Sequence, residues 1–198
     1  MGRKPRIEFD GALYHIIQRG NNKECIFSNN LHKNYFISKM EEFKETMNFD
    51  VYGYVIMDNH YHIVLRRHEK KLSSIMQKLN NDYSKYYNNF YNRTGHVFQG
   101  RYKGILVRDE KYLLSLLRYV HQNPVRANIC KNVFNYYWSS DPYYRRNLHR
   151  QLVDIDLILN IFSSDRKTAI EEYCKFMDAS ELEESSNFED LHIIGDIK

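Results

Sequence analysis

The chain has 198 residues, of which 27% are charged and 15% aromatic, and it carries a net charge of +4. This size fits one domain with a small appendage, and the excess of basic residues favours a polyanionic partner. Three widely separated cysteines exclude a disulfide framework, no apolar run reaches the roughly 20 residues of a membrane span, and residues 1–10 lack a signal-peptide core, so we expect a cytoplasmic protein outside any membrane.

The first two predicted elements are a strand and a helix. Ala12–Arg19 is rich in β-branched and aromatic residues and ends at turn-forming residues 20–22, which predicts a strand. His15 lies within this strand, and we expect it to pack in the sheet, although it could also approach a site built by residues further along the chain. The range 31–47 has apolar residues at helical spacing, which predicts a helix with one buried face.

The range 51–67 contains two runs of β-branched and aromatic residues around the polar pair at 58–59, the pattern of a tight hairpin. Successive strand side chains point to opposite faces, so His60 and His62 share one face. The other face is expected to hold Tyr61, Ile63 and Leu65. Two adjacent imidazoles are candidate ligands for a divalent metal, although two surface histidines would give the same pattern.

A second helix and a basic loop follow the hairpin. The range 72–91 has a helical apolar stripe, and its polar face could lie near a substrate or simply face solvent. The loop 92–104 is punctuated by glycines and combines cations with aromatic rings, a composition that suits single-stranded nucleic acid. The side chains concerned are Arg93, Arg101, Tyr102 and Lys103. A strand is predicted over 105–108.

The third predicted helix begins at the N-cap residue Asp109 and is expected to end near Asn123, because proline disfavours the helical conformation of the residue before it. Tyr119 and Asn123 lie one turn apart on one flank of its apolar stripe. If this flank covers the histidine face, a phenol and an amide oxygen join the two imidazoles. Alternatively, Tyr119 is one of 17 tyrosines that pack at helix edges.

The order strand, helix, strand, strand, helix, strand, helix predicts an α+β fold with a four-stranded antiparallel sheet and helices packed on one face. A C-terminal helical extension follows, with short helices that start at the caps Asp154 and Asp165. The domain boundaries expected from this pattern are 1–138, 139–179 and an acidic, mobile tail over 180–198.

Three segments together resemble a known family. M-D-N-H-Y-H-I-V-L, G-H-V-F-Q-G-R-Y-K and L-R-Y-V-H-Q-N-P-V-R-A are similar, in order and spacing, to insertion-sequence-type single-tyrosine HUH transposases, above all to the REP-associated tyrosine transposases. The resemblance runs from about Gly11 to Trp138. It implies a ferredoxin-like or RRM-like sheet and a catalytic domain over 1–138.

The resemblance also implies roles for individual residues. His60 and His62 would hold a divalent metal, Mg²⁺ or Mn²⁺, and Asn123 would complete the site. Tyr119 would attack a phosphodiester of single-stranded or hairpin DNA to form a 5′-phosphotyrosine bond and free a 3′-OH. Arg101 and Lys103 would contact the DNA backbone, with Tyr102 and Arg93 beside them. Some family members act as dimers, and the sequence is compatible with either a monomer or a homodimer.

Two other functions fit parts of the pattern. A nucleic-acid-binding module on the same sheet would need no nucleophile. A metal hydrolase that activates water would need a carboxylate near the histidines, and Asp58 is the nearby candidate. Within the transposase hypothesis, Tyr102 is the alternative nucleophile to Tyr119.

Overall fold

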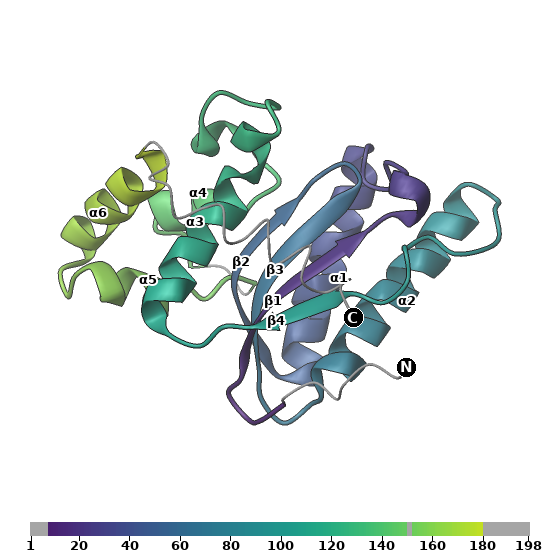
Figure 1. Ribbon diagram of the computed structural model, residues 1–198, viewed down its shortest axis with the longest axis horizontal. Coiled ribbons are helices and arrows are strands. Elements are labelled where there is room, and N and C mark those ends of the chain that lie inside the picture. Colours follow the sequence, from purple (N-terminus) through teal and green to yellow (C-terminus); the bar gives the residue numbers. More distant parts are fainter. Residues whose placement is uncertain (1–7, 150–151, 180–198) are drawn as a thin grey trace, which may run out of the picture.

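The computed structural model describes residues 8–149 and 152–179. The N-terminal stretch with the basic residues Arg3, Lys4 and Arg6, and the acidic tail predicted for 180–198, lie outside the described residues. Four strands form one antiparallel sheet in the order β2-β3-β1-β4 (Figure 1). They are β1 (Leu13–Arg19), β2 (Phe49–Ile56), β3 (His60–Arg67) and β4 (Lys103–Leu106). With α1 (Asn30–Met47) after β1 and α2 (Leu72–Phe90) after β3, this is the ferredoxin-like arrangement, which confirms the predicted fold class.

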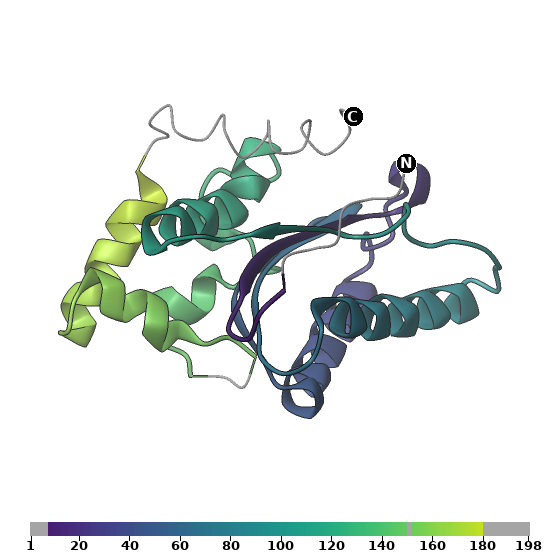
Figure 2. The same cartoon turned by 60° about the horizontal axis from the view of Figure 1, so that its bottom comes forward.

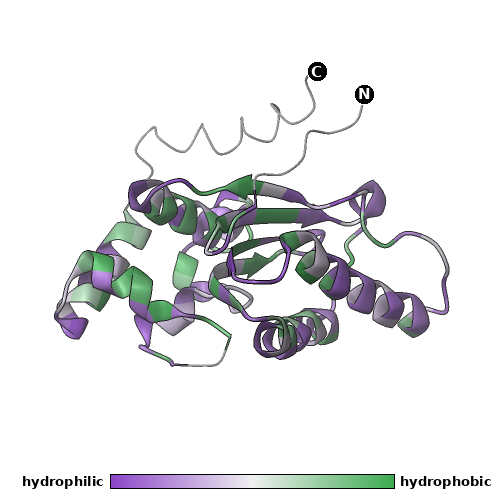
Figure 3. Cartoon of the chain, turned by 90° about the horizontal axis from the view of Figure 1, so that it is seen from below, coloured by the Kyte–Doolittle hydropathy of each residue, from purple (hydrophilic) through white to green (hydrophobic). Residues whose placement is uncertain are grey.

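The main core lies between the sheet and the helices α1 and α2. Strand alternation points Tyr61 toward these helices, and its ring packs against Phe36 and Phe27 with centroid distances of 4.7 and 6.2 Å. All three side chains are fully buried. Figure 3 shows hydrophobic residues concentrated in the strands, with hydrophilic residues along the outer turns of the helices. This layer fixes which face of β3 is left for His60 and His62.

The opposite face of the sheet receives α3 (Glu110–Arg126), so the helices do not all pack on one face as predicted. Of the C-terminal helices, α6 (Arg166–Asp178) contacts α3, and α5 (Ile155–Phe162) packs against α6 (Figure 2). Gly53 of β2 permits this contact, because a Cβ built there would lie 2.3 Å from Cδ1 of Leu117. Leu117 is fully buried, so the methyl group could not move away without repacking. The glycine therefore sets how closely α3 approaches the sheet.

Two further details differ from the sequence-based expectations. β4 begins two residues earlier than the predicted 105–108, because its extent is set by pairing with β1, where Ile17 lies opposite Lys103. The prediction that Pro124 ends α3 near Asn123 is wrong, since the helix continues to Arg126. Pro124 removes one backbone donor near the end of the helix, and the Ala127 N–H still bonds the carbonyl of Asn123.

Asp154 does not cap α5 with its side chain, contrary to the prediction. Its carboxylate instead accepts from the backbone N–H of Val51 at 3.0 Å and from Lys44 at 2.9 Å. Asp109 and Asp165 do cap their helices, by accepting from Tyr112 and Thr168 respectively. The sequence does not distinguish these two roles of Asp154. An Asp just before a helix fits the N-cap pattern, whether or not its carboxylate accepts from the helix.

The outer edge of β2 is covered by residues 136–144 and by Asp154. Side-chain and backbone groups of these residues bond backbone groups of β2. A short helix in this stretch, α4 (Asp141–Arg145), was not predicted by the sequence analysis. The bonds run from Tyr136 Oη to Ile56 O, Ile56 N to Trp138 O, Tyr54 N to Ser140 Oγ, Ser140 N to Tyr54 O, Tyr144 Oη to Tyr52 O, and Asp154 N to Val51 O.

A buried polar network joins α3 to this C-terminal part. His121 Nε2 lies 2.6 Å from Ser140 Oγ, and its Nδ1 lies 3.0 Å from Tyr173 Oη. The Tyr173 hydroxyl donates to Asp141, which also accepts from Arg145. Burial first, and then the Arg145 charge, lower the pKa of His121 to about 3, so the imidazole is neutral at neutral pH.

We expect acid to destabilise the fold through His121. An unfolded chain titrates this histidine near pH 6.5, so between about pH 6.5 and about pH 3 the unfolded state binds one proton more. The free energy of unfolding should then fall with decreasing pH, by at most about 1.4 kcal/mol per pH unit. Urea unfolding at about pH 7 and about pH 5 measures this loss, and His121→Gln should lose less. Burial raises the pKa of Asp141, which makes acid stabilising at that residue, but this contribution is the same in wild type and in His121→Gln.

The prediction is contradicted if the free energy of unfolding falls equally with decreasing pH in wild type and in His121→Gln.

Candidate active site

The site begins on β3, whose first residue is His60. His60 and His62 share the sheet face opposite Tyr61, and their ring centroids are 5.1 Å apart. His62 is buried, whereas His60 is partly exposed. Strand pairing places Val55, His62, Ile17 and Lys103 in one row across the sheet. Lys103 therefore lies on the histidine face, two strands away from His62.

Tyr119 reaches this face from α3. Its ring meets His62 edge-on with a centroid distance of 5.6 Å, and it meets His15 at 6.1 Å. The contact follows from the docking of Leu117 at Gly53, which turns the next residues of α3 toward the middle of the sheet. The structure thus brings the tyrosine flank of the helix onto the histidine face. Tyr119 is 6% exposed, so it lies at the bottom of the site.

His15 is a third imidazole in the site. Its Nε2 lies 2.9 Å from Nδ1 of His62, and the two rings stack with a centroid distance of 5.1 Å. The sequence analysis placed His15 in the sheet and left open whether it approaches the site, because the register between β1 and β3 is not visible in a local pattern. His60 is oriented in a similar way, since its Nδ1 lies 2.6 Å from the amide oxygen of Asn59. Both candidate ligands are thus oriented through Nδ1.

The donor set fits a divalent metal with N and O ligands. With Nδ1 of each ring engaged as described, Nε2 of His60 and His62 are the atoms that would ligate the ion. Asn123 donates its amide N–H to the carbonyl of Tyr119 at 2.8 Å, so its amide oxygen is the atom that would ligate an ion if Asn123 completes the site. Within residues 8–149 and 152–179, no group of three or more His, Cys, Asp or Glu could hold a metal. The amide oxygen, water and substrate would complete the coordination.

The other predicted site residues are distributed around the β4 edge of the sheet. Arg101 is exposed, whereas Arg93 forms an ion pair with Glu24 at 2.8 Å. Tyr102 precedes Lys103 and therefore faces the opposite side of the sheet from the histidines. This orientation separates Tyr102 from the site as an alternative nucleophile. Asp58, the candidate base of a hydrolase, forms a 2.7 Å ion pair with Lys33.

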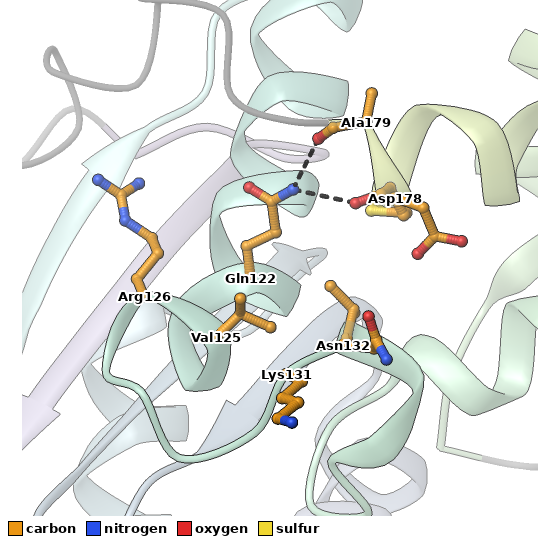
Figure 4. Close-up of a pocket in the computed structure, with 9 residues that line it drawn as sticks. Gln122, Val125, Arg126, Lys131, Asn132, Asp178 and Ala179 are labelled. Atoms are coloured by element: carbon orange, nitrogen blue, oxygen red, sulfur yellow. Dashed lines mark hydrogen bonds between the residues drawn. The ribbon is translucent and has the colours of Figure 1, made fainter.

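A pocket of about 340 Å³ lies one helical turn beyond Tyr119, between α3 and α6 (Figure 4). The side-chain amide of Gln122 donates to the carbonyls of Met177 and Ala179 at 2.9 and 3.4 Å. These bonds satisfy carbonyl groups at the end of α6 and connect that end to α3, the helix that carries Tyr119. On the same helix, the guanidinium of Arg126 lies 5.1 Å from the centre of the Tyr119 ring.

Residues 9–123 match the model of the family described as "Transposase IS200 like". The chain belongs to the IS200-like transposase family. The matched range contains His15, His60, His62, Tyr119 and Asn123, whereas the helices α4 to α6 lie beyond it.

One solved structure shares the fold. A REP-associated tyrosine transposase bound to a REP hairpin has a TM-score of 0.61 and 17% identity, with 79% of this chain and 93% of that chain covered. A candidate transposase from Deinococcus radiodurans R1 has a TM-score of 0.43 and 9% identity, covering 62% of this chain and 97% of that chain. The search of curated proteins gave no match. In this IS200-like transposase, none of the described helices is long and apolar enough to span a membrane.

Proposed function

We propose that this IS200-like transposase cleaves and rejoins single-stranded or hairpin DNA through a covalent bond between Tyr119 and a 5′-phosphate. The observation that carries the proposal is the contact of the Tyr119 ring with His62, which unites a nucleophile and a candidate metal ligand from distant parts of the chain. The structural neighbour bound to a REP hairpin supports a DNA substrate of this kind.

The reaction would exchange one phosphate ester for another. The Tyr119 oxygen forms a bond to phosphorus and the phenol loses its proton, while the bond from phosphorus to O3′ breaks and O3′ takes up a proton. The products are a 5′-phosphotyrosine and a free 3′-OH, and attack by a 3′-OH on the phosphotyrosine reverses the step. A divalent metal held by His60, His62 and Asn123 would supply positive charge beside the phosphate oxygens.

The basic residues around the site would bring in the phosphodiester. Lys103 lies on the histidine face and Arg126 lies beside the Tyr119 ring, so both place positive charge where an anionic backbone must approach. Arg101 would extend this charge along the β4 edge. His60 is the partly exposed member of the site, and we place the entry of the DNA there.

His15 is expected to act as a positioning residue for His62. For Nε2 of His62 to bind metal, its Nδ1 must carry the proton and donate to His15. His15→Leu leaves that donor buried without its acceptor, so Mn²⁺ affinity, measured by electron paramagnetic resonance, should fall about 10–100-fold. His15→Gln should restore much of the affinity, because the amide oxygen can accept.

The matched control for His15 is His32, another fully buried histidine, which bonds Tyr86 and Tyr91 on the far face of the sheet. His32→Leu should lower stability but leave Mn²⁺ affinity unchanged. Equal affinities in wild type and His15→Leu would remove the positioning role.

The experiment that tests the proposed function is covalent trapping. End-labelled hairpin-bearing single-stranded DNA is incubated with the protein and Mn²⁺, and the products are separated on a denaturing gel with an EDTA control. A labelled protein–DNA band that requires metal is the expected result. Metal-independent binding without a covalent band would favour the non-catalytic binding module. The hydrolase alternative predicts cleavage without a band, and the ion pair of Asp58 with Lys33 argues against it.

A further inference from the structure

A groove of about 430 Å³ with polar walls runs between α2 and the segment 95–102, on the sheet face opposite the histidines. Its floor is apolar and is made by Met76, Val97 and Phe98, all of which are buried. The size lies within the range of about 300–1,000 Å³ that is usual for ligand sites. An apolar floor of this kind accepts a flat ring.

The helix side of the groove presents neutral hydrogen-bonding groups. Gln77 and Asn81 are one turn apart on the exposed flank of α2, and Asn80 lies between them. Carboxamides both donate and accept, which matches the mixed donor and acceptor edges of nucleobases. Among the described residues that line the groove there is no Asp or Glu, so nothing there repels a phosphate backbone.

The opposite rim carries Arg101 and Tyr102. A cation and an aromatic ring at the mouth of a site with an apolar floor suit an unpaired strand, in which the phosphates meet the guanidinium and a base stacks on the phenol. A duplex keeps its bases stacked inside and shows only their edges in the grooves, so it cannot fill this floor.

The groove lies a short way around the β4 edge from the candidate active site. Lys103 faces the histidines, whereas Tyr102, its neighbour in sequence, lines the groove. The two sites also share strand β3, since Tyr61, which separates His60 and His62, donates to the side-chain oxygen of Asn80 at 2.7 Å. A single strand leaving the histidine face can therefore pass Lys103 and enter the groove.

We infer that the groove between α2 and residues 95–102 is a second DNA subsite that binds unpaired bases next to the cleaved segment. The inference rests on the proposed function for its substrate, but not on Tyr119 being the nucleophile. Amide contacts from Gln77 and Asn81 would give the subsite a base preference, and Tyr102 would stack on a base.

The test measures binding of fluorescein-labelled single-stranded DNA of randomised sequence by anisotropy, in EDTA so that nothing is cleaved, with a duplex of equal length as the comparison. Asn81→Asp and Tyr102→Ala should each weaken single-strand binding about tenfold and leave duplex binding unchanged. Tyr102→Phe should bind like wild type. Asn89→Asp, which adds the same charge at an exposed position of α2 outside the groove, is the matched control.

Crosslinking supplies an independent readout. With 5-iododeoxyuridine in the strand, irradiation should attach DNA to a peptide that contains residues 95–102. Unchanged single-strand affinity in both groove variants, equal losses for single strand and duplex, or crosslinks confined to other peptides would each overturn the subsite. A selective loss in the groove variants, from a protein that forms no covalent band, would uphold the subsite while refuting the proposed cleavage.

Discussion

Replacing Tyr119 by phenylalanine is expected to abolish the covalent protein–DNA band and to lower strand cleavage by at least about 10³-fold. The ring and its contacts with His62 and His15 are retained in Tyr119→Phe, so the fold and the metal site should survive. What is lost is the oxygen that forms the bond to phosphorus. The measurements are the gel assay with end-labelled DNA, Mn²⁺ affinity and the urea unfolding midpoint.

The matched control is Tyr102→Phe, which removes a hydroxyl of the same kind on the other side of the sheet. This variant should cleave at the rate of wild type. A band that persists in Tyr119→Phe and disappears in Tyr102→Phe would transfer the nucleophile to Tyr102. Such a result would also show that the β4 edge rearranges when DNA binds, since Tyr102 faces away from the histidines.

His60→Ala is expected to have the second large effect. This substitution removes one candidate ligand at a partly exposed position, so it should weaken Mn²⁺ binding and reduce cleavage at saturating DNA by at least about 100-fold, with little change in stability. His62→Ala should show the same loss of metal binding together with destabilisation, because His62 is buried against His15 and Tyr119.

The control for His60 is His68, which lies just beyond the far end of β3 and bonds Asp50 at 3.0 Å. His68→Ala removes the same kind of side chain at a site that plays no part in the proposed reaction. If His60→Ala binds Mn²⁺ as tightly as His68→Ala does, the metal is held elsewhere, and the assignment of His60 as a ligand is wrong.

Local patterns predicted much of this fold. The alternation of β3 and the apolar stripes of α1, α2 and α3 have short periods, so single segments reveal which face is buried. These periods were enough to place His60 and His62 on one face of β3, and Tyr119 and Asn123 on one flank of α3. Whether the face and the flank meet depends on Gly53, which admits Leu117, and no local pattern contains that contact.

Several features that the sequence analysis left open or predicted wrongly depend on long-range partners. His15 lies beside His62 because β1 pairs with β3 across 47 positions of the chain. Asp154 serves β2 rather than its own helix, and Tyr102 is separated from the histidines by the register of β4. α3 passes Pro124 because packing and the remaining backbone bonds outweigh one lost donor. Each of these outcomes is decided by tertiary structure, which propensity does not encode.

The covering of β2 by residues 136–144 and Asp154 bears on solubility. An edge strand with unsatisfied backbone groups is a template for pairing with another chain, and β2 is long and apolar. At the other end of the sheet, β4 has only four residues and lies beside the basic segment, which limits such pairing. A chain shortened to end before Tyr136 would retain every residue proposed for catalysis, yet it would expose β2 along its length. We expect this shortened chain to self-associate and aggregate before it loses its proposed active site.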